Sequence, residues 1–100
     1  MQGIIKIILR YYGHLEVMEL LVYDGADINE EYNGGYTPLF WACIRGHVEI
    51  VKYLVDKGAN TKIKDASGKT PLDRARKGNC KEIIAILSRT QYRFQKLQLA

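Results

Sequence analysis

The residue types that most often carry catalysis or bind metals are few in this chain, and their spacing is unfavourable for both. His14 and His47 lie 33 positions apart. Neither is followed by a second ligand at i+3 or i+4, the spacing that is typical of a zinc site on a helix. Cys43 and Cys80 form no CxxC pair. They could form one disulfide, but their spacing does not require it, and we favour two reduced thiols in an intracellular protein. We therefore predict no metal and no cofactor.

The sequence motifs of common enzyme classes are also missing. The glycines of Asn33-Gly34-Gly35 lack the GxxxxGK[ST] frame with which a phosphate-binding loop holds a nucleotide. Ser67 and Ser88 have no histidine close by in the sequence, and Cys43 would need an adjacent base to act as a nucleophile. These observations predict a protein that is not an enzyme.

Composition predicts a folded domain with an uneven charge distribution. Of the 100 residues, 47% are hydrophobic and 26% are charged, which is typical of a globular domain. No apolar run reaches the roughly 18 residues that a membrane-spanning helix needs, so we predict no membrane span. Residues 1–50 carry three Lys and Arg against seven acids, whereas residues 51–100 carry twelve against four. The second half is therefore the part that would attract an acidic partner.

An internal repeat of 33 residues organises the chain. Four short blocks recur in a single register: Gly13–Val17 at Gly46–Ile50, Asp24–Asp27 at Lys57–Asn60, Thr37–Leu39 at Thr70–Leu72, and Glu49–Val51 at Glu82–Ile84. A repeated period of this length is typical of solenoids, in which each unit is completed by packing against its neighbours.

Each block predicts a local structure. Thr-Pro begins a helix, because proline is tolerated at the first helical position and a threonine side chain can cap the free N–H groups. We expect this helix over residues 38–45, ended by a left-handed Gly46. A second helix is expected over residues 48–57, because apolar residues there follow a helical period: Val48, Ile50, Val51, Leu54 and Val55.

The segment Gly35–Asn60 resembles the ankyrin repeat, a unit of a β-turn and two antiparallel helices, and the resemblance extends over about residues 4–88. It implies an all-α solenoid of stacked helix-turn-helix units with β-hairpin-type loops. The implied repeats are 1–32, 33–65 and 66–90, followed by a C-terminal tail, 91–100, that could continue as a helix. The family has histidine where this chain has Phe40 and Asp73, so that histidine's hydrogen bonds are not available. Asn79 stands in place of the glycine between the two helices.

The resemblance also implies a non-enzymatic module that binds another protein through its hairpin tips and concave helix face. The residues at those variable positions are Glu31, Asn33, Tyr36, Trp41, Ile44 and Arg45 in the second unit, and Lys64, Ser67, Lys69, Arg74, Lys77 and Gly78 in the third. We expect Tyr36 to be exposed, while Trp41 either contacts the partner or packs between helices. The basic residues favour an acidic protein surface over nucleic acid, because no aromatic side chains alternate with them.

Two other interpretations remain open at this stage. The chain could be a homo-oligomeric or structural unit, or part of a longer array, with the isoleucine-rich segment Ile4–Leu9 as its contact. It could also be a substrate for modification, because Leu21, Asp27, Ile28 and Asn29 resemble the family pattern recognised by asparaginyl hydroxylases of the oxygen-sensing type. Asn29 is the candidate residue. For either interpretation, as for the binding module, we expect a cytoplasmic or nuclear location.

Overall fold

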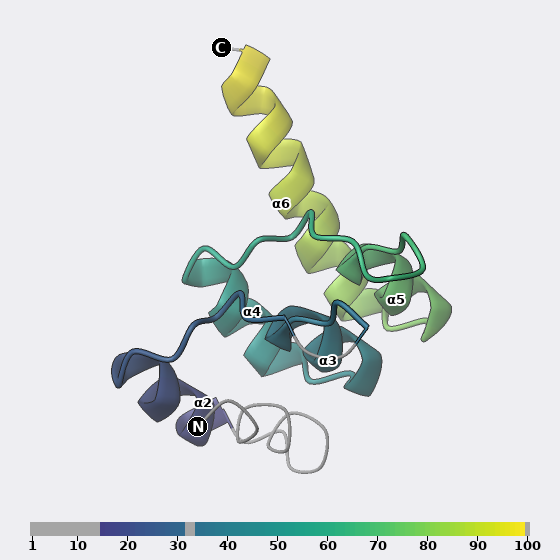
Figure 1. The fold of residues 1–100 in the computed structure, drawn as a ribbon. Coiled ribbons are helices and arrows are strands. Elements are labelled where there is room, and N and C mark those ends of the chain that lie inside the picture. The colour runs from purple at the N-terminus through teal and green to yellow at the C-terminus, as the bar shows by residue number, and fades with distance from the viewer. Residues whose placement is uncertain (1–14, 32–33, 100) are drawn as a thin grey trace.

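The computed structural model describes residues 15–31 and 34–99, which contain five helices separated by turns and loops (Figure 1). The helices are α2 (Leu15–Tyr23), α3 (Pro38–Arg45), α4 (Val48–Asp56), α5 (Pro71–Lys77) and α6 (Lys81–Leu99). The isoleucine-rich segment lies outside the described residues.

The helices form two layers, as expected for stacked helix-turn-helix units. One layer consists of α3 packed beside α5, and the other places α4 between α2 and α6. Within a unit the two layers meet, because α3 packs on α4 and α5 packs on α6. The predicted bounds of the 38–45 helix are confirmed, and the next helix ends one residue earlier than predicted. The helix α6 continues through residue 90 to Leu99 and extends beyond the other helices (Figure 1).

The hydrophobic core lies between these layers and has contributions from each described unit. Leu54 is fully buried at the centre of α4, and Ile83 is fully buried on α6. The predicted inward positions of α3 are confirmed, because Leu39, Ala42 and Cys43 are each at most 2% exposed. In α4, Ile50, Val51 and Leu54 are buried, whereas Val48 and Val55 are half-buried at the margin of the core.

The turn between the two helices of a unit has the predicted left-handed residue in both complete units. Gly46 has a φ of 74°, and Asn79 occupies the equivalent position with a φ of 56°. Asparagine tolerates this conformation better than other residues with a Cβ. Each turn is closed by a matching backbone bond, from His47 N to Ala42 O at 2.9 Å and from Cys80 N to Ala75 O at 3.2 Å.

The two Thr-Pro helix starts differ in a way that the repeat did not predict. Thr70 forms a reciprocal capping box with Asp73, because its Oγ1 accepts from Asp73 N at 3.2 Å while Asp73 Oδ2 accepts from Thr70 N at 3.0 Å. The expected side-chain cap is absent at Thr37. The residue equivalent to Asp73 is Phe40, which is fully buried and has no acceptor. Among the described residues, Thr37 Oγ1 is buried without a hydrogen-bond partner.

This difference predicts opposite effects of the same substitution in two repeats. Thr70→Val removes the Oγ1 acceptor of the Asp73 N–H, which is one of the two bonds of the capping box. This variant should lower the free energy of unfolding by about 0.5–2 kcal/mol. Thr37→Val replaces an unpaired buried hydroxyl with a methyl group, and should leave stability unchanged or raise it slightly. Urea unfolding followed by circular dichroism measures both. An equal loss of stability in the two variants would contradict the assigned caps.

Candidate partner-binding site

The predicted recognition residues that the structure describes are found mainly on the surface. Ile44 is 40% exposed, and the other exposed members are Glu31, Arg45, Lys64, Ser67, Lys69, Lys77 and Gly78. Asn33 lies outside the described residues. Trp41, Ile44 and Arg45 follow the helical spacing i, i+3 and i+4, so they occupy one side of α3.

An aromatic cluster of Tyr36, Phe40 and Trp41 lies at the start of α3. The Tyr36 ring meets Phe40 edge to face at a centroid distance of 5.6 Å, and it lies 5.4 Å from the Trp41 ring in a tilted arrangement. Phe40 is fully buried, whereas Tyr36 and Trp41 are half-buried. The prediction that Tyr36 is exposed is therefore wrong in part, because its ring packs on its neighbours. Tyr36 and Trp41 each keep part of their surface exposed to solvent.

The carboxylate of Asp65, in the loop before α5, accepts four hydrogen bonds. Its Oδ1 accepts from Ser67 N and Lys69 N, both at 2.9 Å. Its Oδ2 accepts from Nε of Arg74 at 3.0 Å and also from Nη2 of Arg74. The side chain is only 1% exposed. Four donors therefore satisfy a buried charge that would otherwise be costly to remove from water.

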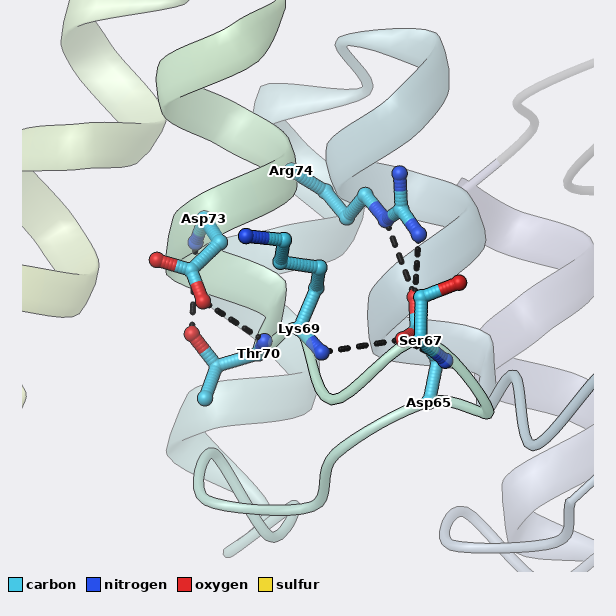
Figure 2. Close-up of polar contacts among 6 residues, drawn as sticks. All are labelled: Asp65, Ser67, Lys69, Thr70, Asp73 and Arg74. Carbon is cyan, nitrogen blue, oxygen red and sulfur yellow. Dashed lines mark hydrogen bonds and ion pairs between the residues drawn. The ribbon is translucent and has the colours of Figure 1, made fainter.

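Arg74 connects this carboxylate to the aromatic cluster. Two of its nitrogens bind the Asp65 carboxylate (Figure 2). Its guanidinium carbon also lies 5.8 Å from the centroid of the Tyr36 ring. We expected Arg74 among the residues that contact a partner, but it is half-buried and its charge is balanced within the protein. One side chain on α5 thus fixes both the loop before its own helix and an aromatic ring of the preceding unit.

Neighbouring loops are also joined directly by backbone and side-chain bonds. Ala66 N donates to Gly34 O at 2.9 Å. A Cβ on Gly35 would come within 3.3 Å of the Asp65 Cα, so the two loops approach as closely as a glycine allows. One unit earlier, Asn60 N donates to Oδ1 of Asn29 at 2.8 Å. These contacts hold successive loops in a fixed relation along one edge of the stack.

The same bonds shift the ionisation of two carboxyl groups. Burial alone raises the pKa of Asp65, but the hydrogen bonds from Lys69 N, the Arg74 side chain and Ser67 N outweigh burial and hold that pKa below its ordinary value. The Thr70 N–H has the same effect on Asp73, whose pKa is also lowered. Both groups therefore stay ionised under mildly acidic conditions.

Sequence reasoning missed two features of the surface. Leu20 is 63% exposed and Tyr23 is 88% exposed, on the outer side of α2. The Asp65–Arg74 pair was also missed, although the 33-residue register contains a signal for it. The positions equivalent to Asp65 and Arg74 one unit earlier are Tyr32 and Trp41. Both members of the pair therefore change together, from two aromatic residues to an acid and a base.

The Cys43 thiol is buried and is not activated for catalysis. Burial, together with the nearby Cys80, raises the pKa of the Cys43 thiol to about 12, so this thiol is protonated at neutral pH and a poor nucleophile. No group of three or more His, Cys, Asp or Glu that could hold a metal ion occurs within the described ranges. In the same ranges, no helix has both the length and the apolar character needed to cross a bilayer.

Comparison with protein families identifies the scaffold. A family model described as ankyrin repeats matches residues 5–96, in three copies. The chain belongs to the ankyrin-repeat family. No curated protein matches the sequence significantly. Ankyrin repeats generally serve as protein-protein interaction modules and are generally non-enzymatic. Membership of this family is consistent with a protein-interaction module and identifies no specific partner.

Asn29, the candidate for modification, has a structural role in the ankyrin stack. Its backbone N–H donates to Oδ1 of Asp27 at 2.8 Å, and its side-chain oxygen accepts the bond from Asn60 that joins two loops. The residue is exposed. The next unit repeats the local turn, because Lys62 N donates to Oδ1 of Asn60 at 2.9 Å. Hydroxylation of Asn29 stays a prediction.

The coordination of Asp65 predicts an acid-dependent loss of stability. Its folded-state pKa lies below the unfolded value of about 3.9, so its stabilising effect is complete above that value and is lost as the pH falls through the folded-state pKa. Asp65→Asn should therefore lower the urea midpoint at pH 7, and the gap to the wild type should narrow towards pH 2.

The matched control is Asp56→Asn, which removes an exposed carboxylate at the end of α4. This variant should show no comparable gap from the wild type at pH 7. A gap between Asp65→Asn and the wild type that stays constant from pH 7 to pH 2 would show that the charge of Asp65 is unimportant.

Proposed function

We propose that this ankyrin stack is an intracellular, non-enzymatic module that binds another protein through its loop tips and the exposed side of α3. The observation that carries the proposal is the fixed aromatic edge of Tyr36 and Trp41, which lies beside the exposed side chains of Ile44 and Arg45. Tryptophan, tyrosine and arginine are the residue types that contribute most often to binding energy at protein interfaces.

The way the aromatic edge is held also favours recognition. Tyr36 packs against the buried Phe40 on one side and meets the Arg74 guanidinium on another. Arg74 is itself held by Asp65. A side chain that is already ordered loses little conformational freedom when a partner binds, so a larger share of the contact energy appears as affinity.

The remaining residues of the proposed surface extend it along the loop edge. Within the described ranges they are Glu31 before the second unit, Lys64, Ser67 and Lys69 in the next loop, and Lys77 at the end of α5. Asn33 belongs to the same proposal from its place in the sequence. Both cysteines are free thiols, which supports a location inside the cell, where thiols stay reduced.

The proposal is tested by affinity capture from a lysate with two matched double variants. Trp41→Ala/Arg45→Ala removes an aromatic residue and a cation four positions apart on α3. Tyr53→Ala/Lys57→Ala removes an equivalent pair on α4, where the Lys57 ammonium lies 5.8 Å from the Tyr53 ring. A partner of the proposed surface should be lost with the first variant and kept with the second.

With a purified partner, Trp41→Ala/Arg45→Ala should lose about 2 kcal/mol or more of binding free energy. This loss should appear mainly as faster dissociation of the complex. Thermal melts of both variants establish that each remains folded. Equal retention of every captured protein by the two variants would place the binding surface elsewhere.

A second candidate function is self-association, and the exposed side of α2 favours it. Leu20 and Tyr23 are three residues apart on this helix and are the two most exposed large apolar side chains among those described. Sedimentation velocity at increasing protein concentration should then show a dimer for the wild type and a monomer for Leu20→Ser/Tyr23→Ser. Ile44→Ser, which removes an exposed apolar residue from α3, is the control that should still dimerise. A wild type that stays monomeric at high micromolar concentration excludes this candidate.

A further inference from the structure

A hollow of about 260 Å³ lies along α5, and its lining is strongly cationic. It is lined by Lys69, Asp73, Arg74, Arg76 and Lys77. Lys69 comes from the loop before the helix, and the others are on α5 itself. Asp73, Arg76 and Lys77 follow spacings of three and four residues, so they share one side of the helix. The hollow is therefore a continuous feature of one element and its preceding loop.

Two of the five charged groups are already occupied within the protein. The Arg74 guanidinium points away from Asp73 and binds Asp65 on the other side of the helix (Figure 2). The Asp73 carboxylate accepts from Thr70 N at 3.0 Å and completes the capping box. Neither group is free to bind a ligand without disturbing the fold.

The three remaining cations are Lys69, Arg76 and Lys77, and they differ from Arg74 in their ion pairing. Within the part of the chain that the structure describes, no carboxylate forms an ion pair with Lys69, Arg76 or Lys77, and all three are exposed. The Lys69 side chain extends along α5 towards Asp73, and the charges of Lys69 and Arg76 help to lower the pKa of that carboxyl group (Figure 2). Three exposed cations and a single carboxylate, which is engaged in the capping box, thus line the hollow together with Arg74.

We infer that this hollow binds a carboxylate-rich segment of the partner protein, an inference that rests on the proposed function and specifies the partner's chemistry. Lys69, Arg76 and Lys77 would contact the carboxylates, and Arg74 would not. Carboxylates complement a compact group of cations that the fold does not neutralise. The charge on this surface makes the encounter with an acidic partner faster and dependent on salt.

The size and surroundings of the hollow favour a peptide over nucleic acid. The seven residues of α5 span only about 10 Å, which suits two or three carboxylates, whereas duplex-binding proteins commonly contact six to ten phosphates. None of the described aromatic residues lines the hollow, and the Tyr36 ring that Arg74 contacts packs against Trp41 rather than forming an open stacking platform. Arg74 joins the hollow to this aromatic edge, so a segment that places apolar and acidic residues next to each other fits both.

The experiment uses the full chain and a fluorescein-labelled hexaglutamate peptide, with hexaglutamine as the uncharged comparison. Binding is measured by fluorescence anisotropy at two ionic strengths. The test variant is Lys69→Gln/Arg76→Gln/Lys77→Gln. The matched control is Lys52→Gln/Lys57→Gln/Arg89→Gln, which removes the same number of lysines and arginines from exposed positions on or next to α4 and α6. Thermal melts establish that both variants are folded.

We expect the test variant at Lys69, Arg76 and Lys77, called the hollow variant below, to bind hexaglutamate about tenfold or more weakly than the wild type. The control variant should change the affinity by less than about threefold. Higher salt should weaken binding of the wild type and have a smaller effect on the hollow variant. These two results together support the inference.

Other outcomes overturn the inference and separate it from the proposed function. An equal loss of hexaglutamate affinity in the hollow variant and the control variant would show that the peptide is attracted only by the overall charge of the protein. Equal binding of hexaglutamine would exclude carboxylate recognition. A single-stranded oligonucleotide that competes more strongly, and through the same three residues, would identify nucleic acid as the ligand instead. If hexaglutamate does not bind the hollow while Trp41→Ala/Arg45→Ala still loses the captured partner, the hollow is excluded and the proposed function stands.

Discussion

The buried carboxylate of Asp65 is the interaction on which the arrangement of the candidate surface depends. Four hydrogen bonds converge on it, from two backbone N–H groups of its own loop and from two nitrogens of Arg74. The backbone bonds shape the loop, and the arginine ties that loop to α5. Because the same guanidinium lies over Tyr36, the position of an aromatic ring in one unit depends on an acid in the next. The Asp65–Arg74 ion pair therefore stabilises both the shape of its own loop and the contact between neighbouring units.

This ion pair also decides which charges are available to a partner. Sequence alone treats Arg74 and Lys77 alike, as basic residues at variable positions of one helix. In the structure Arg74 is balanced by Asp65, whereas Lys77 has no carboxylate within ion-pair distance among the described residues. An ion pair that fixes the scaffold gives up most of its attraction for an outside anion, because its charges already neutralise each other. The residues that hold the surface together and those that can attract a partner are consequently different, although they are neighbours on α5.

The repeat register predicted the helices well because helix starts and ends depend on short stretches of sequence. The bounds of α3, the left-handed turns at Gly46 and Asn79, and the buried positions of α3 all followed from residues close together in the chain. The reciprocal capping box of Thr70 is not repeated at Thr37, because the position of Asp73 is taken by Phe40, whose buried ring has no acceptor for the Thr37 N–H. The role of Arg74 could not be read locally, since its partner lies nine residues away and its aromatic contact lies in another unit.

Two adjacent substitutions in the repeat explain why neighbouring units of the same fold present different chemistry. Where the second unit has Phe40 and Trp41, the third unit has Asp73 and Arg74. The first exchange replaces a buried ring with a capping carboxylate, and the second replaces an aromatic surface residue with a guanidinium that needs Asp65. Neither exchange disturbs the layer packing of α3 against α5, because the inward residues Leu39 and Leu72 are retained. The surface of such a stack can therefore change from apolar to cationic between one repeat and the next. The condition is that each charge that becomes buried has a side chain of opposite charge to pair with.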